Sequence, residues 1–418
     1  MGYMILLDIV EEHLEEADFL WSHRQSALAD RGSTLHRQAE IEERLLAHLD
    51  GLLLSEDAGW QFLAPKLTDG ATGEAFAAGW VALASERSQY VDALLAATST
   101  AQGKVFDGIR QAFCHAPDQR VMPLLTSLLS ADGAPHRAVA LDALSFRRAP
   151  IPDRQLQVAL LDKEPLVSTA GLTAVGRLRK QSLAASVETL LNAEQPSVRR
   201  EAVRAGLLLG SDKAVAHCRA AAQGKADEAS SALTLLGLMS QADYTHLFGQ
   251  ALNQLENVRQ AVSSLRWLGY SAGINDLVPL AGDRKLARVV GDTISRITGV
   301  DLVAEGLVLS SLPSAGVQQA DSDEDKYVDD PDEGLPWPDP AKLSAWWKAN
   351  ASRFKATSRY QNGRPYTRQT LVETLQQGKL ADRHHAAFEL ALLDPTGPLI
   401  ETSAFADRQR HLCANLRC

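Results

Sequence analysis

The sequence is poor in several residue types and segments that mark particular classes of protein. Aromatic residues make up only 6% of its 418 residues, and it has four cysteines, at positions 114, 218, 413 and 418. These cysteines follow no disulfide-like spacing, so we expect a reducing, cytoplasmic location. No stretch approaches the roughly 18 uncharged apolar residues that a spanning helix needs, so we expect no membrane partner. The N-terminus lacks the basic region and cleavage site of a signal peptide.

Sequence signatures of catalysis and metal binding are also missing. The chain has no GxxxxGK[ST] phosphate loop, no GxGxxG after a strand and no GxSxG nucleophile elbow. Its histidines and cysteines lack the paired spacing that announces a zinc site. We therefore predict a protein that is not an enzyme, with no cofactor and no bound metal. A catalytic triad built from scattered residues would leave no local signature, and an enzyme on a helical scaffold stays the alternative.

The acidic charge of the chain is concentrated in one segment. The net charge is -10, and the run "DSDEDKYVDDPDE" at 321–333 holds eight acids and one lysine. The rest of the chain is close to neutral and has no domain-wide basic surface, so we predict no nucleic-acid partner. Asp321, Asp323 and Asp325 are spaced as in a calcium loop, but Lys326 replaces the turn glycine and Asp332 the final glutamate. A solvated acidic loop is the favoured interpretation, with docking on a basic partner as the alternative.

A phrase of small and apolar residues recurs along the middle of the chain. In "QPSVRREAVRAGLLLG", residues 195–210, a break and an Arg pair precede apolar residues at helical spacing, and Gly closes the phrase. Four copies place a small anchor residue eight positions before a glycine: Ala202 before Gly210, Ala229 before Gly237, Ala261 before Gly269 and Gly291 before Gly299. Two weaker copies have Ala138 and Ala170 as anchors, and successive anchors are 27 to 32 residues apart.

This repeat predicts the fold. Each anchor phrase is preceded by another apolar stretch at helical spacing. Two helices of about twelve residues and two turns therefore fill one period, which indicates a helical hairpin whose second helix carries the anchor. One hairpin cannot bury its own apolar stripe, so neighbours must share a core. We predict an all-α fold, an α-solenoid of short hairpin repeats with helical caps. The predicted ranges are 1–60 for an N-terminal cap, 61–305 for the repeat array, 306–340 for an acidic, Pro-rich linker and 341–418 for a C-terminal helical segment.

Two resemblances follow from these motifs. The phrases "PSVRREAVRAGLLLG" and "ENVRQAVSSLRWLG" resemble HEAT-type helical repeats of a short variety. Motifs near the ends, "EEADFLWSHR", "EERLLAHLDGL" and "DAGW" at the front and "WPDPAKLSAWWKANASRF", "GRPYT" and "FELALLDP" at the back, are similar to an uncharacterised bacterial HEAT-repeat-like family. Genes of that family often lie beside type VI secretion genes. The resemblance spans nearly the whole chain and brings no catalytic residues.

Arginines at equivalent positions of the second helices form the candidate binding site. Some lie two residues before their anchor and others five after it, and residues in equal register stack into ladders along a solenoid. Because arginine favours interfaces with carboxylates, we predict an acidic protein partner. The candidate protein-binding residues are Arg200, Arg204, Arg259, Arg266, Trp267 and Arg296. In the alternative, these arginines pair with acids of the adjacent repeat and Trp267 belongs to the core.

The leading hypothesis for function is a non-enzymatic protein-binding scaffold. The resemblance implies a type VI secretion accessory that acts as adaptor or chaperone and loads an effector onto the secreted spike protein. A related alternative is an immunity protein that binds and neutralises a cognate toxin. Two further classes stay open: a HEAT-like repeat enzyme of the bilin lyase or DNA glycosylase type, and a self-assembling structural protein. The sequence leaves the oligomeric state open.

Overall fold

The computed structural model describes residues 7–224, 226–239, 244–254, 256–311, 330, 332–394 and 396–414. Within these ranges the chain is all-α, which confirms the predicted fold class. Their only sheet is a small antiparallel hairpin of β1 (Tyr360–Gln361) and β2 (Arg364–Pro365). No helix in the described ranges is long and apolar enough to cross a membrane.

The chain forms two compact units. Unit 1 combines Met1–His217 with Leu371–Cys418, and unit 2 comprises Cys218–Thr370. Unit 1 is therefore discontinuous in sequence. The predicted repeat array contributes residues to both units, and the division into cap, array, linker and C-terminal segment stays a prediction.

The first part of unit 1 is a succession of helices joined by short turns. They are α1 (Leu7–Ala29), α2 (Leu35–Leu54), α3 (Glu56–Leu63), α4 (Lys66–Asp69), α5 (Thr72–Ala84), α6 (Ser88–Thr100), α7 (Gly103–His115), α8 (Asp118–Leu128), α9 (Ala134–Phe146), α10 (Asp153–Leu160), α11 (Pro165–Arg177), η1 (Gln181–Leu183), α12 (Ala184–Thr189), η2 (Leu190–Asn192) and α13 (Pro196–Leu208). α14 (Asp212–Ala221) follows and crosses the boundary between the units in sequence.

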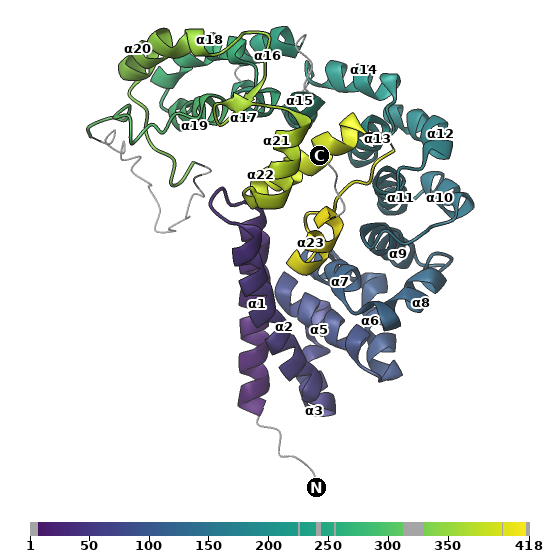
Figure 1. Cartoon of the computed structure of the whole chain (residues 1–418). Helices are drawn as coiled ribbons and strands as arrows, with labels where there is room; N and C mark the ends of the chain where they lie inside the picture. The colour runs from purple at the N-terminus through teal and green to yellow at the C-terminus, as the bar shows by residue number, and fades with distance from the viewer. Residues whose placement is uncertain are drawn as a thin grey trace, which may run out of the picture. The chain divides into compact units, whose positions relative to one another are not determined.

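Alternate helices of unit 1 pack on one another in chain order. α5 packs against α7, α7 against α9, α9 against α11 and α11 against α13. Figure 1 shows α9, α11 and α13 in a row. The anchors Ala138 and Ala202 are buried, as expected of small residues where helices approach closely. In the weaker copy Gly171 makes the close contact instead of Ala170, because a Cβ there would lie 3.0 Å from the Cβ of Ala159.

The turns explain why some copies of the phrase are weak. α13 begins at Pro196, the proline of the break that opens the phrase, and Gly210 after its end has a left-handed φ of 75°. At the corresponding turns after α9 and α11, Arg148 and Arg179 take that conformation, with φ of 58° and 56°. A residue with a Cβ in this region costs about 1 kcal/mol, which glycine avoids.

The C-terminal part of unit 1 packs on its N-terminal helices. This part contains α21 (Arg368–Gln377), which begins just before it, α22 (Leu380–Leu393) and α23 (Ala406–Ala414). α22 contacts α1 and α13, and α23 contacts α2; in Figure 1 these yellow helices lie against the purple and blue ones. Phe388 and Ala404 are buried, so this part belongs to the core of the unit.

Unit 2 is built in the same way from a shorter series of helices. They are α15 (Ala226–Met239), α16 (Tyr244–Leu252), α17 (Val258–Leu268), η3 (Ser271–Gly273), α18 (Ile274–Leu277), η4 (Val278–Gly282), α19 (Ala287–Thr298), α20 (Pro340–Asn350) and η5 (Ala351–Arg353). α15 packs against α17, and α17 against α19. α20 packs on η4, and the buried Trp347 donates its Nε1–H to Asn275 Oδ1 at 2.9 Å.

The β-hairpin covers the ends of two helices in unit 2. α17 and α19 both end at a glycine, Gly269 and Gly299, with φ of 73° and 75°. The Tyr360 amide donates to the Gly269 carbonyl at 2.8 Å, and the Asn362 amide donates to the Arg296 carbonyl at 2.6 Å. The hairpin therefore satisfies carbonyls that a helix C-terminus leaves without partners.

The N-terminal helices differ in one respect from the apolar stripes that the sequence indicates. The spacing of apolar residues in the sequence predicts one buried stripe with Leu14, Phe19 and Leu20 and another with Leu45. Leu14 and Leu20 of α1 and Leu45 of α2 are buried as predicted. The assignment of Phe19 to the buried stripe is wrong, because its side chain is 59% exposed. The buried stripe of α1 follows helical spacing through Leu14, Ala17, Trp21 and Arg24, and Phe19 points away from it.

Candidate protein-binding surfaces

The C-terminal segment of unit 1, defined here as residues 371–414, is held by buried polar contacts. Arg24 is fully buried, and its Nε donates to Glu42 Oε1 at 2.8 Å. The same guanidinium donates to the Ser403 carbonyl at 2.7 Å, while the Ala406 amide donates to Glu42 Oε2 at 2.6 Å. This ion pair between α1 and α2 therefore binds backbone groups of the turn at Ser403 and of the first residue of α23.

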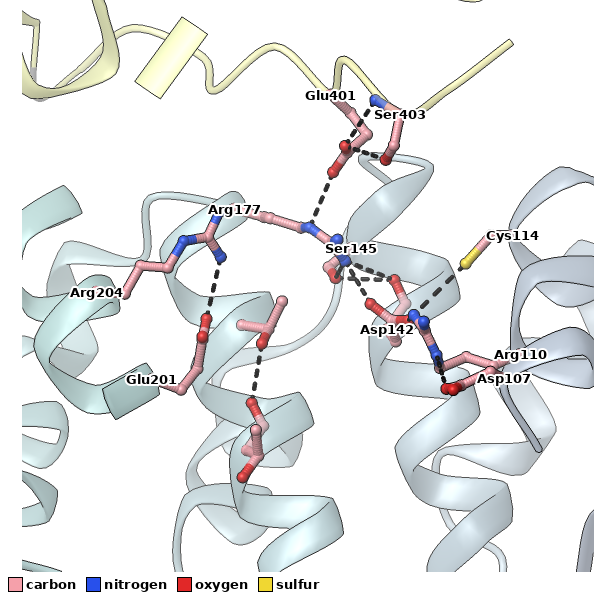
Figure 2. Close-up of polar contacts among 12 residues, drawn as sticks. Asp107, Arg110, Cys114, Asp142, Ser145, Arg177, Glu201, Arg204, Glu401 and Ser403 are labelled. Atoms are coloured by element: carbon pink, nitrogen blue, oxygen red, sulfur yellow. Dashed lines mark hydrogen bonds and ion pairs between the residues drawn. The ribbon is translucent and has the colours of Figure 1, made fainter. Parts of the chain in front are cut away.

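A chain of alternating charges runs across helices α7, α9 and α11 of unit 1 (Figure 2). Asp142 of α9 lies between two arginines, with Oδ2 2.5 Å from Arg110 NH1 and Oδ1 2.5 Å from Arg177 NH1. Arg177 of α11 also lies 3.1 Å, through Nε, from Glu401 Oε2 of the C-terminal segment. Glu401 in turn accepts a 2.5 Å bond from the Ser403 hydroxyl. We call these four charged residues the ionic network.

The electrostatics of the ionic network keep both acids ionised. Burial alone would raise the pKa of Asp142, but Arg177 and Arg110 outweigh it and hold that pKa below its usual value. For Glu401, burial is likewise outweighed, mainly by Arg177, and the pKa is again lowered. The two arginines and two carboxylates neutralise one another. The network thus uses carboxylate recognition to fix the chain's own C-terminal segment.

The thiol beside the ionic network is not activated. Cys114 Sγ lies 3.9 Å from Asp142 Oδ2, and burial, followed by the charge of Asp142, raises the pKa of the thiol to about 12. A neutral, buried thiol is neither a nucleophile nor a metal ligand. In the part of the chain that the structure describes, no three His, Cys, Asp or Glu side chains are grouped to hold a metal ion.

Two of the predicted site residues belong to α13 in unit 1. Arg204 NH1 lies 3.2 Å from Glu201 Oε1 on the same helix, and its guanidinium stacks 5.4 Å from the ring centroid of Phe388. Arg204 therefore contacts the C-terminal segment. Arg200 is exposed to solvent. The structure does not bring these two arginines into the ionic network.

Three other predicted residues gather in unit 2 around one indole ring. Trp267 is buried, and the guanidiniums of Arg266 and Arg296 lie 4.7 Å and 5.8 Å from its ring centroid. Arg266 NH1 also lies 3.2 Å from Asp292 Oδ2 on the neighbouring helix α19. A cavity of about 380 Å³ is lined by Asp292, Arg296 and the hairpin residue Asn362. Here the arrangement matches the alternative of acid pairing between adjacent repeats and a tryptophan in the core.

The last predicted residue, Arg259, binds the chain's own acidic run. Its NH2 lies 2.5 Å from Asp332 Oδ1 and its NH1 donates to the Lys285 carbonyl at 3.0 Å. Arg288 of α19 binds Asp330 in the same way, at 2.7 Å and 2.8 Å to the two carboxylate oxygens. Most of the run, including Asp321, Asp323, Asp325 and Lys326, lies outside the described residues.

Sequence reasoning missed most of the residues that make these contacts: Arg24, Glu42, Arg110, Asp142, Arg177, Arg288 and Glu401. Arg288 lies three residues before its anchor, one position from the register in which Arg200 and Arg259 were found. Asp142 and Arg177 lie four and seven residues after their anchors, on the same helices as the repeat phrase. A search of every position of the second helices for either charge would have found these three. Glu401 has no local signal, because its partner is far away in sequence.

Comparison with known proteins adds nothing to this description. No protein-family model matches the chain, and no curated protein matches it either.

Proposed function

We propose that this chain is a non-enzymatic protein-binding scaffold of HEAT-like helical hairpins. It acts in the cytoplasm as an adaptor or chaperone of type VI secretion, and its client is a secreted effector. The proposal of a scaffold is supported by the fold and by the polar chemistry of both units. The proposed setting is supported by the resemblance of the end motifs alone.

One observation carries the proposal of protein binding. In each unit, an arginine of a repeat helix binds a carboxylate from a distant part of the chain. Arg177 of α11 binds Glu401 in unit 1, and Arg259 of α17 binds Asp332 in unit 2. Backbone carbonyls are bound as well, as in the contact of Arg24 with Ser403. Recognition of carboxylates and backbone carbonyls is chemistry that a scaffold can use on a partner protein.

Co-purification tests the proposal. The tagged full-length chain is recovered from the bacterium that expresses it, and bound proteins are identified. An adaptor is expected to recover both an effector and the spike protein. Recovery of a toxin alone, together with loss of the toxin's activity, would replace the adaptor role with that of an immunity protein. If no protein is recovered above an untagged control, the scaffold proposal is wrong.

A further inference from the structure

The two arginines that bind the acidic run lie on neighbouring helices of unit 2. Arg259 is at the start of α17 and Arg288 at the start of α19, and these helices pack on each other. The Arg288 guanidinium also stacks on Trp337, 4.7 Å from the ring centroid. Together Arg259, Arg288 and Trp337 form a small cationic surface with an aromatic wall, which we call the arginine pair site.

The occupant of this site is a short acidic stretch of the chain itself. Asp330 and Asp332 are two residues apart, and each reaches a different arginine. Arg288 NH1 also donates to the Asp332 carbonyl at 3.0 Å, and the Asp332 amide donates to Asp330 Oδ1 at 3.0 Å. The site therefore binds two carboxylates and one peptide carbonyl at fixed positions along the chain, as expected for a peptide ligand.

Solvent reaches one side of the contact. The Arg259 side chain is 39% exposed and that of Asp330 is 45% exposed, whereas Asp332 is covered. Ion pairs open to water contribute little to stability, so the Asp330 arm can exchange with a competing carboxylate at small cost. The guanidiniums also hold the pKa of Asp330 below its usual value, chiefly through its hydrogen bond with Arg288.

We propose that the arginine pair site binds an acidic peptide segment of the partner protein. In the absence of the partner, Asp330 and Asp332 of the chain itself occupy the site. The partner segment carries two carboxylates two residues apart and displaces the internal one. This inference rests on the proposed scaffold function for the existence of a partner, and it adds the surface and the chemistry of the contact. A nucleic acid is the less suitable ligand, because the chain has a net charge of -10 and no domain-wide basic surface to neutralise a phosphate backbone.

A peptide-binding measurement on the full-length chain tests the proposal. The probe is a labelled synthetic peptide with the chain's own sequence VDDPDEGL, residues 328–335, followed by fluorescence anisotropy. Asp330→Asn with Asp332→Asn weakens the internal occupant, so the double variant is expected to bind the probe about tenfold more tightly than the wild type. Adding Arg259→Gln and Arg288→Gln to that variant is expected to abolish the gain.

The matched control changes two acids without touching the site. Asp276 and Glu305 are exposed residues of unit 2 outside the acidic stretch, and Asp276→Asn with Glu305→Gln changes the net charge by the same amount. This variant is expected to bind the probe like the wild type. If it gains as much affinity as the Asp330 and Asp332 variant, the effect is general electrostatics and the proposal is wrong.

Further outcomes decide against the proposal. If the double variant keeps the wild-type circular dichroism spectrum and binds the probe no more tightly, the acidic stretch is a fixed structural contact. If the double variant does not fold, Asp330→Asn alone, on the exposed arm, is measured instead and must show a smaller gain in the same direction. If a single-stranded oligonucleotide of equal charge displaces the probe as well as unlabelled peptide does, the site binds phosphates.

The result is separable from the scaffold proposal. Failure of probe binding, with effector still recovered by co-purification, removes the arginine pair site and leaves the scaffold. Recovery of no protein by co-purification, with the probe still bound, removes the scaffold and leaves a peptide site without a client.

Discussion

Asp142 is the residue on which the ionic network of unit 1 depends, because among the four residues of the network it is the one that contacts both arginines, Arg110 of α7 and Arg177 of α11. Its side chain is 9% exposed, and replacing it with alanine leaves Arg110 and Arg177 facing each other without their shared carboxylate. Breaking a buried pair in this way typically costs about 3 kcal/mol. Asp142→Ala is therefore expected to lower the free energy of unfolding of unit 1 by about that amount, measured by urea denaturation.

Asp107 provides the matched control, since it lies 3.8 Å from the same Arg110 but is 60% exposed. Asp107→Ala is expected to cost less than about 1 kcal/mol, as exposed ion pairs do. Equal losses for the two variants would mean that burial of the network contributes nothing to the stability of unit 1.

The buried His115 is expected to make the stability of unit 1 depend on pH. Burial, followed by the charges of Arg24 and Arg147, holds the pKa of His115 well below its usual value. The folded protein therefore keeps a neutral imidazole at a pH where the unfolded chain, with a pKa of about 6.5, takes up a proton. The free energy of unfolding therefore falls as the pH drops below about 6.5, by up to about 1.4 kcal/mol per pH unit for one proton.

The prediction is checked by urea denaturation at pH 7.5 and pH 5. His115→Phe, which suits a site surrounded by Trp21, Phe76, Phe146 and Phe405, is expected to reduce the loss of stability between these two values. The exposed His411 serves as control, and His411→Phe is expected to leave the loss unchanged. An unchanged loss in the His115 variant would assign the pH dependence to other groups.

At the scale of helices, Gly108 sets how closely α5 and α7 approach. A Cβ at this position would lie 2.3 Å from the Thr72 carbonyl oxygen and 2.9 Å from the Phe76 amide nitrogen, both backbone atoms. Gly108→Ala improves helix propensity by about 1 kcal/mol, yet overpacking of this kind costs about 1–3 kcal/mol. We expect a net loss of stability and a lower melting temperature for unit 1.

Gly249 in α16 is the counterpart without this contact, because a Cβ there would meet no atom within 4 Å. Gly249→Ala is expected to raise the stability of unit 2 by about 0.4–1 kcal/mol. If Gly108→Ala were stabilising as well, the close approach of α5 and α7 would not limit the packing of this pair.

The helices were predictable from the sequence because their signals are local. The breaks at Pro196 and Asn257, the buried anchors and the glycines after α17 and α19 are all readable within one hairpin. The polar partners were less predictable, because Glu401 and Asp332 reach their arginines from far along the chain. Periodicity states which face of a helix is buried, but not which distant segment covers it.

The same distinction holds at the scale of the whole molecule. The anchors on either side of residue 217, Ala202 and Ala229, are 27 residues apart, the shortest spacing in the series, but the phrase recurs on both sides of the boundary between the units. The contribution of the C-terminal segment to unit 1 depends on α22 and α23 packing against α1, α2 and α13, contacts that close long loops in the chain. The repeat therefore predicted how neighbouring hairpins pack, and left open where the chain returns.

The discontinuity of unit 1 leads to a prediction for thermal unfolding. Phe388, at 3% exposure, lies beyond unit 2 in sequence but inside the core of unit 1, together with the fully buried Val175 of α11. Phe388→Ala and Val175→Ala are expected to lower the same calorimetric transition, because large-to-small changes in one core cost about 2–5 kcal/mol each. Leu265→Ala, in the core of unit 2, is expected to lower the other transition. If Phe388→Ala moved the transition that Leu265→Ala moves, the C-terminal segment would not be part of unit 1.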